Sequence, residues 1–208
     1  MLTAPGQLAG DPVMPDTTAE PRAGHPLGVA LELLCADAPG RVTGAPEDWP
    51  RWAVLLPHVL AAADHLDQAA WPPDQAVLDD ASWLLDRAGT YLQVHARLDD
   101  ARPLLERALA IDEAAYGPDH PHVATALNNL AQILQDLGQP GQARPLQERA
   151  LAIDEAAYGP DHPAVARDLN NLALILRALR QPGLARPLLE RALAVTKGRE
   201  GQRSTPDR

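Results

Sequence analysis

Phenylalanine is absent from this chain of 208 residues, and aromatic side chains make up only 3% of it. Hydrophobic residues nevertheless reach 46%, so a core has to be built chiefly from alanine and leucine. Both are strong helix formers, and neither is among the residues enriched in strands. The composition therefore predicts an all-α protein.

Cysteine occurs once, at Cys35, which excludes an intrachain disulfide and a metal site built from cysteines. Because no histidine lies close to it in the sequence, Cys35 is predicted to be a small buried apolar residue rather than a nucleophile. The chain also lacks the phosphate-binding pattern G-x-x-x-x-G-K-[ST] and the nucleophile pattern G-x-S-x-G. We therefore expect no enzymatic activity and no cofactor.

Positive charge is scarce as well, since 18 lysines and arginines face 28 aspartates and glutamates, for a net charge of −10. Nucleic acids and anionic membranes reward a basic surface, so neither is expected as a partner. The amino terminus lacks the basic and apolar regions of a secretory signal, and no apolar run approaches the ~20 residues that span a bilayer. These absences predict a cytoplasmic protein.

An internal repeat is the main feature that the sequence does contain. The stretch ALAIDEAAYGPDHP occurs letter for letter at Ala108–Pro121 and Ala150–Pro163, a spacing of 42 residues. The same spacing relates LNNLA at 127–131 to LNNLA at 169–173, with LDRAG at 85–89 in the same register. A fixed period is typical of stacked units that offer their neighbours the same surface. We predict three units at residues 80–121, 122–163 and 164–196, a tryptophan-rich helical cap at residues 25–79, and disordered segments at residues 1–24 and 197–208.

Each unit is predicted to hold two helices. In the second unit the first helix carries a one-sided apolar stripe and begins after the sequence DHP, where Asp119 or His120 is the expected cap. The second helix opens near Pro140, and Pro145 is expected among the first backbone N–H groups, which have no partner inside the helix. A glycine after tyrosine, such as Gly117, is expected to end each pair.

The period, the absence of strand patterns and the small residues where helices cross together resemble the tetratricopeptide repeat, in the 42-residue variety of kinesin light chains and many bacterial proteins. The matching residues are HVATALNNLAQILQDLGQPGQARPLQERALAIDEAAYGPDHP at His122–Pro163 and its two neighbours, roughly residues 80–196. The resemblance implies an all-α solenoid of helical hairpins that acts as a scaffold or adaptor for protein or peptide partners.

A second resemblance concerns the segment upstream of the repeats. PEDWPRWAVLLPHVLAAADHL, followed by the first repeat, is similar to the junction before the repeats in bacterial NB-ARC-type signalling ATPases. Because the chain has no phosphate-binding loop, this resemblance implies a sensor or regulatory arm without the ATPase domain. That role, and a self-associating structural element, remain alternatives to the adaptor.

The resemblance also implies where a partner binds. The first helix of each pair lines the concave side, and its face away from the leucine stripe gives the candidate partner-binding residues Arg87, Thr125, Asn129, Gln132, Asp136, Arg167 and Asn171. The same projection places Trp83, Thr90, Val94, Leu174 and Ala178 on this face. In the family an asparagine at the positions of Asn129 and Asn171 commonly clamps the peptide backbone, whereas the first unit departs from that pattern with Arg87. Two arginines here would favour a partner with an acidic side chain or a free carboxylate.

A simpler interpretation of the paired asparagines is that the units are recent copies. Asn128 and Asn170 are then solvated helix positions, and Asn129 and Asn171 only satisfy neighbouring groups. Histidines in the links, such as those of HPH, are more readily explained by helix starts than by a metal site, because no cysteine or carboxylate cluster completes one. We expect no metal.

The end of the third unit suggests a self-association surface. Repeat solenoids usually end in a polar capping helix, but the last helix carries four leucines on one side, and the tail REGQRSTPDR is too polar to cover them. The predicted homodimer contacts are Leu184, Leu188, Leu189 and Leu193.

Overall fold

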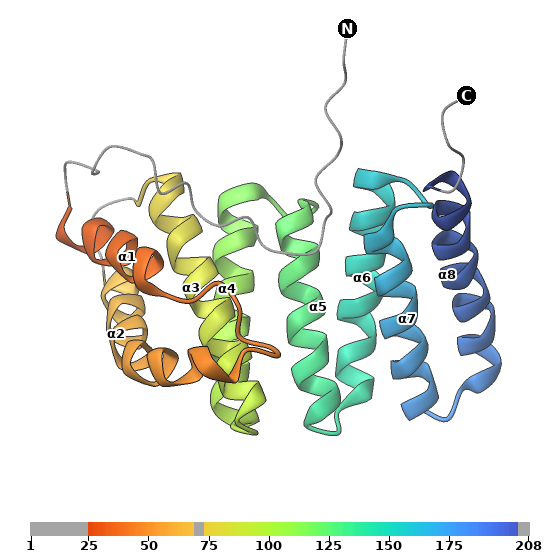
Figure 1. The fold of residues 1–208 in the computed structure, drawn as a ribbon, viewed down its shortest axis with the longest axis horizontal. Coiled ribbons are helices and arrows are strands. Elements are labelled where there is room, and N and C mark those ends of the chain that lie inside the picture. Colours follow the sequence, from red (N-terminus) through yellow and green to blue (C-terminus); the bar gives the residue numbers. More distant parts are fainter. Residues whose placement is uncertain (1–24, 69–72, 204–208) are drawn as a thin grey trace, which may run out of the picture.

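The computed structural model describes residues 25–68 and 73–203, with side chains described as far as Lys197. These residues form helices and no strand, which confirms the all-α prediction. The elements in chain order are α1 (Pro26–Asp37), the 3-10 turn η1 (Pro46–Asp48), α2 (Trp49–Asp67), α3 (Gln75–Val94), α4 (Leu98–Tyr116), α5 (Pro121–Asp136), α6 (Pro140–Tyr158), α7 (Pro163–Ala178) and α8 (Pro182–Arg203) (Figure 1).

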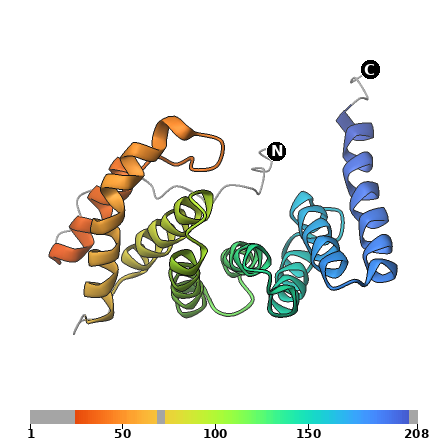
Figure 2. The ribbon, with the colours of Figure 1, turned by 90° about the horizontal axis from the view of Figure 1, so that it is seen from below.

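Three helical hairpins, α3–α4, α5–α6 and α7–α8, stack side by side in chain order. Figure 2 shows that the array curves, with α3, α5 and α7 towards the inside of the curve and α4, α6 and α8 towards the outside. The cap of α1 and α2 closes the end of the array next to α3, and α8 forms the opposite end. The predicted helical-hairpin solenoid with an N-terminal cap is confirmed.

The letter-for-letter repeat builds the same turn twice. The Nδ1 atoms of His120 and His162 accept the backbone N–H two residues further on, at 3.2 and 3.3 Å, so histidine is the cap in each link. Each cap ring stacks on the preceding tyrosine, His120 on Tyr116 and His162 on Tyr158, with centroids 4.5 and 4.4 Å apart. A glycine with positive φ ends both preceding helices, as predicted for Gly117.

The prolines inside the second helices differ from the prediction. Helix α6 begins at Pro140, and the N–H of Ala143 already donates to the carbonyl of Gln139 at 3.2 Å. Pro145 therefore lies beyond the unpartnered first turn, and its helix forgoes one internal hydrogen bond. The prediction that Pro145 would lie among unpartnered N–H groups is wrong, and Pro103 and Pro187 have the same place in α4 and α8.

Two boundaries also move. The side chain of Asp74 accepts the N–H of Val77 at 2.9 Å and caps α3, so the predicted cap–repeat boundary at residue 79/80 falls inside that helix. Helix α8 continues to Arg203, so residues 197–203 of the segment predicted to be disordered are helical. The predicted disordered lead-in at residues 1–24 lies outside the described residues.

The cap shares one hydrophobic core with the first repeat. Trp52 is fully buried, donates its indole N–H to the carbonyl of Pro39 at 3.2 Å and stacks on Tyr91 of α3 with centroids 6.4 Å apart. Cys35 is buried in the same core, as predicted. Helices α5 and α7 each pack on the hairpin that precedes them. Because no repeat hairpin precedes α3 in the described part of the chain, the cap covers the corresponding side of that helix.

Candidate functional site

Several predicted partner-binding residues form hydrogen bonds between successive first helices. Asn129 of α5 donates to Asp86 of α3 at 2.5 Å, and Asp136 of α5 accepts from Gln93 of α3 at 2.6 Å. One step along the array, Asn171 of α7 approaches Asn128 of α5, with 3.5 Å between Nδ2 and Oδ1. Polar side chains of these first helices thus form hydrogen bonds from one unit to the next.

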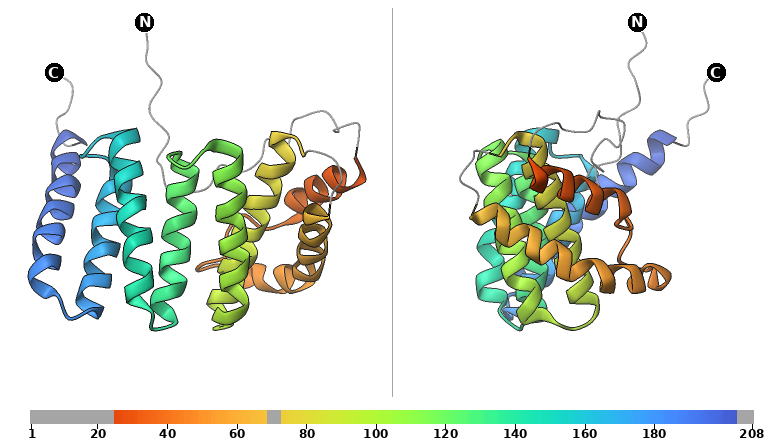
Figure 3. Two further views of the ribbon diagram at one scale, coloured as in Figure 1. Left: turned by 180° about the vertical axis from the view of Figure 1, so that it is seen from behind. Right: turned by 90° about the vertical axis from the view of Figure 1, so that its left-hand side faces the viewer.

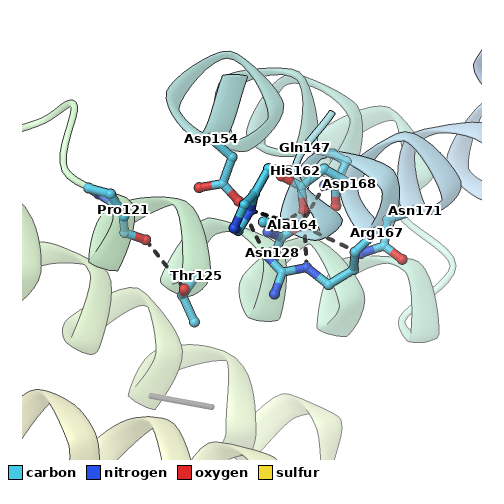
Figure 4. Close-up of polar contacts among 10 residues, drawn as sticks. All are labelled: Pro121, Thr125, Asn128, Gln147, Asp154, His162, Ala164, Arg167, Asp168 and Asn171. Carbon is cyan, nitrogen blue, oxygen red and sulfur yellow. Dashed lines mark hydrogen bonds and ion pairs between the residues drawn. The ribbon is translucent and has the colours of Figure 1, made fainter. Parts of the chain in front are cut away.

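A buried polar cluster lies where the second and third units meet (Figure 4). Asp168 of α7 is 0% exposed and accepts from Asn128 at 2.8 Å. The amide oxygen of Asn128 in turn accepts from the buried Gln147 of α6. Arg167 donates to Asp168 at 3.2 Å and to Asp154 of α6 at 3.3 Å, so one guanidinium bridges two carboxylates.

The electrostatics of this cluster favour a proton on the pair of carboxylates. Burial, followed by the charge of Asp168, raises the pKa of Asp154 to about 7, against the opposing charge of Arg167. Burial also raises the pKa of Asp168, although Arg167 and the Asn128 amide favour its charged form. Two buried carboxylates facing one guanidinium leave an excess negative charge that a single proton neutralises.

The first unit and its interface with the second are built differently. Inside the first hairpin, Ser82 of α3 donates to Asp112 of α4 at 2.5 Å, and burial raises the pKa of Asp112 to about 6 despite that hydrogen bond. Burial likewise raises the pKa of Asp86, against the favourable Arg87 charge and the Asn129 hydrogen bond. The two interfaces share a scaffold but have different polar interiors.

The two arginines of the predicted site have unequal freedom. Arg167 is engaged by two carboxylates, whereas Arg87 lies over the ring of Trp83 at 5.9 Å and approaches Asp86 only to 3.9 Å. The side chain of Arg87 is 13% exposed, and its Nε has no hydrogen-bond partner among the described residues. Arg87 is therefore less engaged by carboxylates than Arg167, although Arg167 is the more exposed of the two at 36%.

The remaining predicted positions vary in accessibility. Gln132 and Asp136 are exposed, while the half-buried Thr125 donates to the carbonyl of Pro121 in its own helix at 3.3 Å. The prediction that Trp83 faces a partner is wrong, because this side chain is buried in the core that the cap shares with α3. Val94 and Leu174 are exposed apolar residues, 37% and 51% respectively.

Sequence reasoning missed the buried cluster, and its suggestion that Asn128 is a solvated position is wrong. Asn128 is buried, whereas its counterpart Asn170 is exposed. A break in the repeat could have indicated this cluster. Asp168 occupies the position of Leu84 and Ala126 in the other units. Gln147 occupies the position of Leu105 and Leu189. A polar residue at a position that is apolar in sister units marks a buried contact.

The histidines of the links are also potential metal ligands. Among the described residues, no three histidine, cysteine or acidic side chains lie together as a metal site would require, and no helix is both long and apolar enough to cross a bilayer. His120 and His122 instead contact the ring of Tyr116, and burial lowers the pKa of His122.

The predicted self-association leucines lie on α8, and three of them are accessible. Leu184, Leu189 and Leu193 are 54%, 38% and 53% exposed. Leu188 is partly buried and packs against the core between α7 and α8.

Comparison with known proteins places this geometry in a family. The profile of the tetratricopeptide repeat matches residues 79–156 and 122–197, more than half of the chain, so the chain belongs to the tetratricopeptide repeat family. Its match begins at residue 79, and the upstream resemblance to NB-ARC-type ATPases therefore stays a prediction. A search of curated proteins gives no match.

Solved structures show the same fold. A Podosopora anserina protein assigned as a kinesin light chain with nearly identical TPR-like repeats is 22% identical, with a TM-score of 0.63, over 88% of this chain and 81% of its own. A variant of that protein is 19% identical, with a TM-score of 0.54, over 86% of this chain and 87% of its own. Repeats of this family generally mediate protein–protein interaction.

Proposed function

We propose that this chain is a non-enzymatic scaffold that holds a peptide segment or a partner protein along the concave side formed by α3, α5 and α7. The observation that supports this most is where the units differ. The end of the second helix and its link are the same residue for residue at 108–121 and 150–163, so the connection from one unit to the next is constant. The concave positions instead read Thr90, Gln132 and Leu174 in one row and Val94, Asp136 and Ala178 in the next.

A constant scaffold with a varied inner face is the pattern expected of recognition. Gln132 and Asp136 offer donors and acceptors to main-chain groups of an extended peptide, and the exposed Leu174 offers an apolar contact. At the end nearest the cap, the guanidinium of Arg87 lies over the ring of Trp83, and the adjacent Asp86 accepts from Asn129. We propose that this arginine binds an acidic side chain or free carboxylate of the partner, while Arg167 mainly stabilises the interface between units.

The test is a selection of peptides from a displayed random library by the full chain, followed by titration of the purified peptides. Gln132→Ala combined with Asp136→Ala should weaken binding about tenfold or more, because exposed contacts at the centre of the concave side are lost. Arg87→Gln should weaken selectively the peptides that contain a carboxylate.

The matched control is Arg102→Ala combined with Glu106→Ala, an exposed ion pair of 2.7 Å on α4. This control should bind the peptides as the unchanged chain does. Selected peptides that bind the concave-side variants and the control equally well would contradict the proposal.

Self-association is a second candidate function, favoured by the exposure of Leu184, Leu189 and Leu193 on α8. In its simplest form it is the homodimer through α8 that the sequence suggests.

A further inference from the structure

The outer face of α8 repeats a surface that is covered elsewhere in the chain. Helix α5 packs on α4, and α7 packs on α6, in the same relative place. Leu189 of α8 corresponds to Leu105 of α4 and Gln147 of α6, which are 2% and 1% exposed. Leu189 itself is 38% exposed, since no described helix follows α8. This face is therefore shaped to receive another helix.

The opposite end of the array has a groove shaped to receive one. Between α1 and α2 lies a groove of about 1000 Å³, whose apolar lining includes Leu27, Leu33, Leu34, Val54 and Leu55. Leu33 and Val54 are 64% and 55% exposed. Among the described residues, the lining comes from α1, α2 and the residues at their ends, His25 and Gln68, and its floor includes Leu55, which belongs to the core that these helices share with α3. The right-hand view of Figure 3 looks onto this end.

We propose that α8 of one copy lies in the α1–α2 groove of a second copy, so that chains join head to tail. A single helix with a row of leucines complements a groove between two helices, as each first helix of the array complements the hairpin before it. The two surfaces lie at opposite ends of the molecule, so one chain cannot satisfy both by itself (Figures 1 and 2). This deepens the self-association candidate and is independent of peptide binding on the concave side.

The charges next to both surfaces are compatible with this contact. Asp37 and Arg51 form an ion pair at the groove, and Arg186 and Glu190 form one beside the leucines of α8 at 2.8 Å. Each of these ion pairs is neutral in sum, although the chain carries −10 overall. Added salt screens the general repulsion between copies, so association should strengthen with ionic strength. Association that weakens with salt would contradict an apolar contact.

A head-to-tail contact uses two different surfaces and leaves one of each free at the ends of every assembly. The average mass should therefore keep rising with concentration, whereas an isologous α8 dimer stops at two chains. Two single variants separate these geometries: Leu33→Asp blocks the groove, and Leu193→Asp blocks α8. Both positions are more than half exposed, so the fold should be retained, which circular dichroism checks.

Sedimentation velocity on the full chain is the experiment. Each variant alone should associate about tenfold more weakly or worse. An equimolar mixture of the two should form a species of two chains, because the intact groove of Leu193→Asp accepts the intact α8 of Leu33→Asp. Leu174→Asp, on the concave side, is the control and should assemble as the unchanged chain does.

Three results would overturn the inference. The unchanged chain could remain a monomer at its highest soluble concentration. Leu33→Asp could dimerise as the unchanged chain does, which would indicate an isologous α8 dimer. The mixture could remain monomeric while both variants are folded. None of these results would affect peptide binding, so failure here is distinguishable from failure of the concave-side proposal.

Discussion

At the scale of single residues, the distinctive feature is the pair of carboxylates that Arg167 bridges between the second and third units. The direction of its pH dependence follows from the raised pKa of Asp154. Below pH 3.8, the ordinary value for aspartate, this group is protonated in both the folded and unfolded chains. Between that value and about 7 the folded chain retains a proton that the unfolded chain releases, so stability falls as pH rises.

We predict that raising the pH from 5 to 8 lowers the free energy of unfolding through this group by about 2 kcal/mol, because the folded chain keeps the proton over roughly two pH units in which the unfolded chain has lost it. Asp154→Asn should lessen the loss, because its amide stays neutral throughout. Urea denaturation at each pH measures both chains. Asp112→Asn is the comparison: with a pKa of about 6, Asp112 should contribute little to the change between pH 7 and 8. A pH profile unchanged by Asp154→Asn would rule out this role for the pair.

Sequence reasoning proposed residues for the concave side but did not predict their contacts. The positions of Asn129 and Arg167 followed from helical periodicity, whereas their partners Asp86 and Asp154 lie 43 and 13 positions away in the sequence. Spacing along one helix does not reveal which carboxylate a neighbouring helix will present. The sequence LNN is the same in both units, so it did not indicate that Asn128 is buried while Asn170 is exposed.

At the scale of elements, the turn between the two helices of each unit has one left-handed residue. It is Ala96 in the first unit, Gly138 in the second and Arg180 in the third, with φ of 57°, 71° and 60°. Only glycine adopts this conformation without a steric penalty. Sequence reasoning recognised the glycine turns at the ends of the second helices. It missed the turn between the two helices of a unit, because the first and third units have alanine and arginine there instead of glycine.

We predict that Ala96→Gly and Arg180→Gly each stabilise the chain by about 0.5–1 kcal/mol, and that Gly138→Ala destabilises it by about 1 kcal/mol. Shifts in the urea midpoint measure these effects. Gly141→Ala is the matched control: it lies three positions further on inside α6, where an added Cβ meets no atom within 4 Å. It should be stabilising or neutral, because alanine is the better helix former. Equal effects of Gly138→Ala and Gly141→Ala would contradict the argument.

At the scale of the whole molecule, the cap completes the core of the first repeat. Trp52 is buried against Tyr91, and buried residues of α1 and α2 join those of α3 and α4 in one cluster. The sequence predicted a cap from its tryptophans, but it placed the end of the cap inside α3. The period predicted the stacking because every unit repeats it, whereas the cap has no second copy from which its packing could be inferred.

We predict that a chain beginning at residue 73, without α1 and α2, melts over a broader range and about 10 °C or more lower. The reason is that α3 then exposes the apolar face that the cap covers. Thermal unfolding followed by circular dichroism measures this. A chain lacking only residues 1–24 is the control and should melt as the full chain does. A sharp transition at the original temperature without the cap would show that the repeats are self-sufficient.

The buried cluster between the second and third units also protects the fidelity of folding. Near-identical units in one chain invite docking in the wrong order, within a molecule or between molecules on crowded ribosomes. If α7 docked on the first hairpin, Asp168 would meet Asp86 and Leu105 where it now meets the amides of Asn128 and Gln147. If α5 docked on a second copy of its own hairpin, Ala126 would leave those amides without their carboxylate. Of these three dockings, only the native one therefore satisfies the hydrogen bonds of Asp168, Asn128 and Gln147.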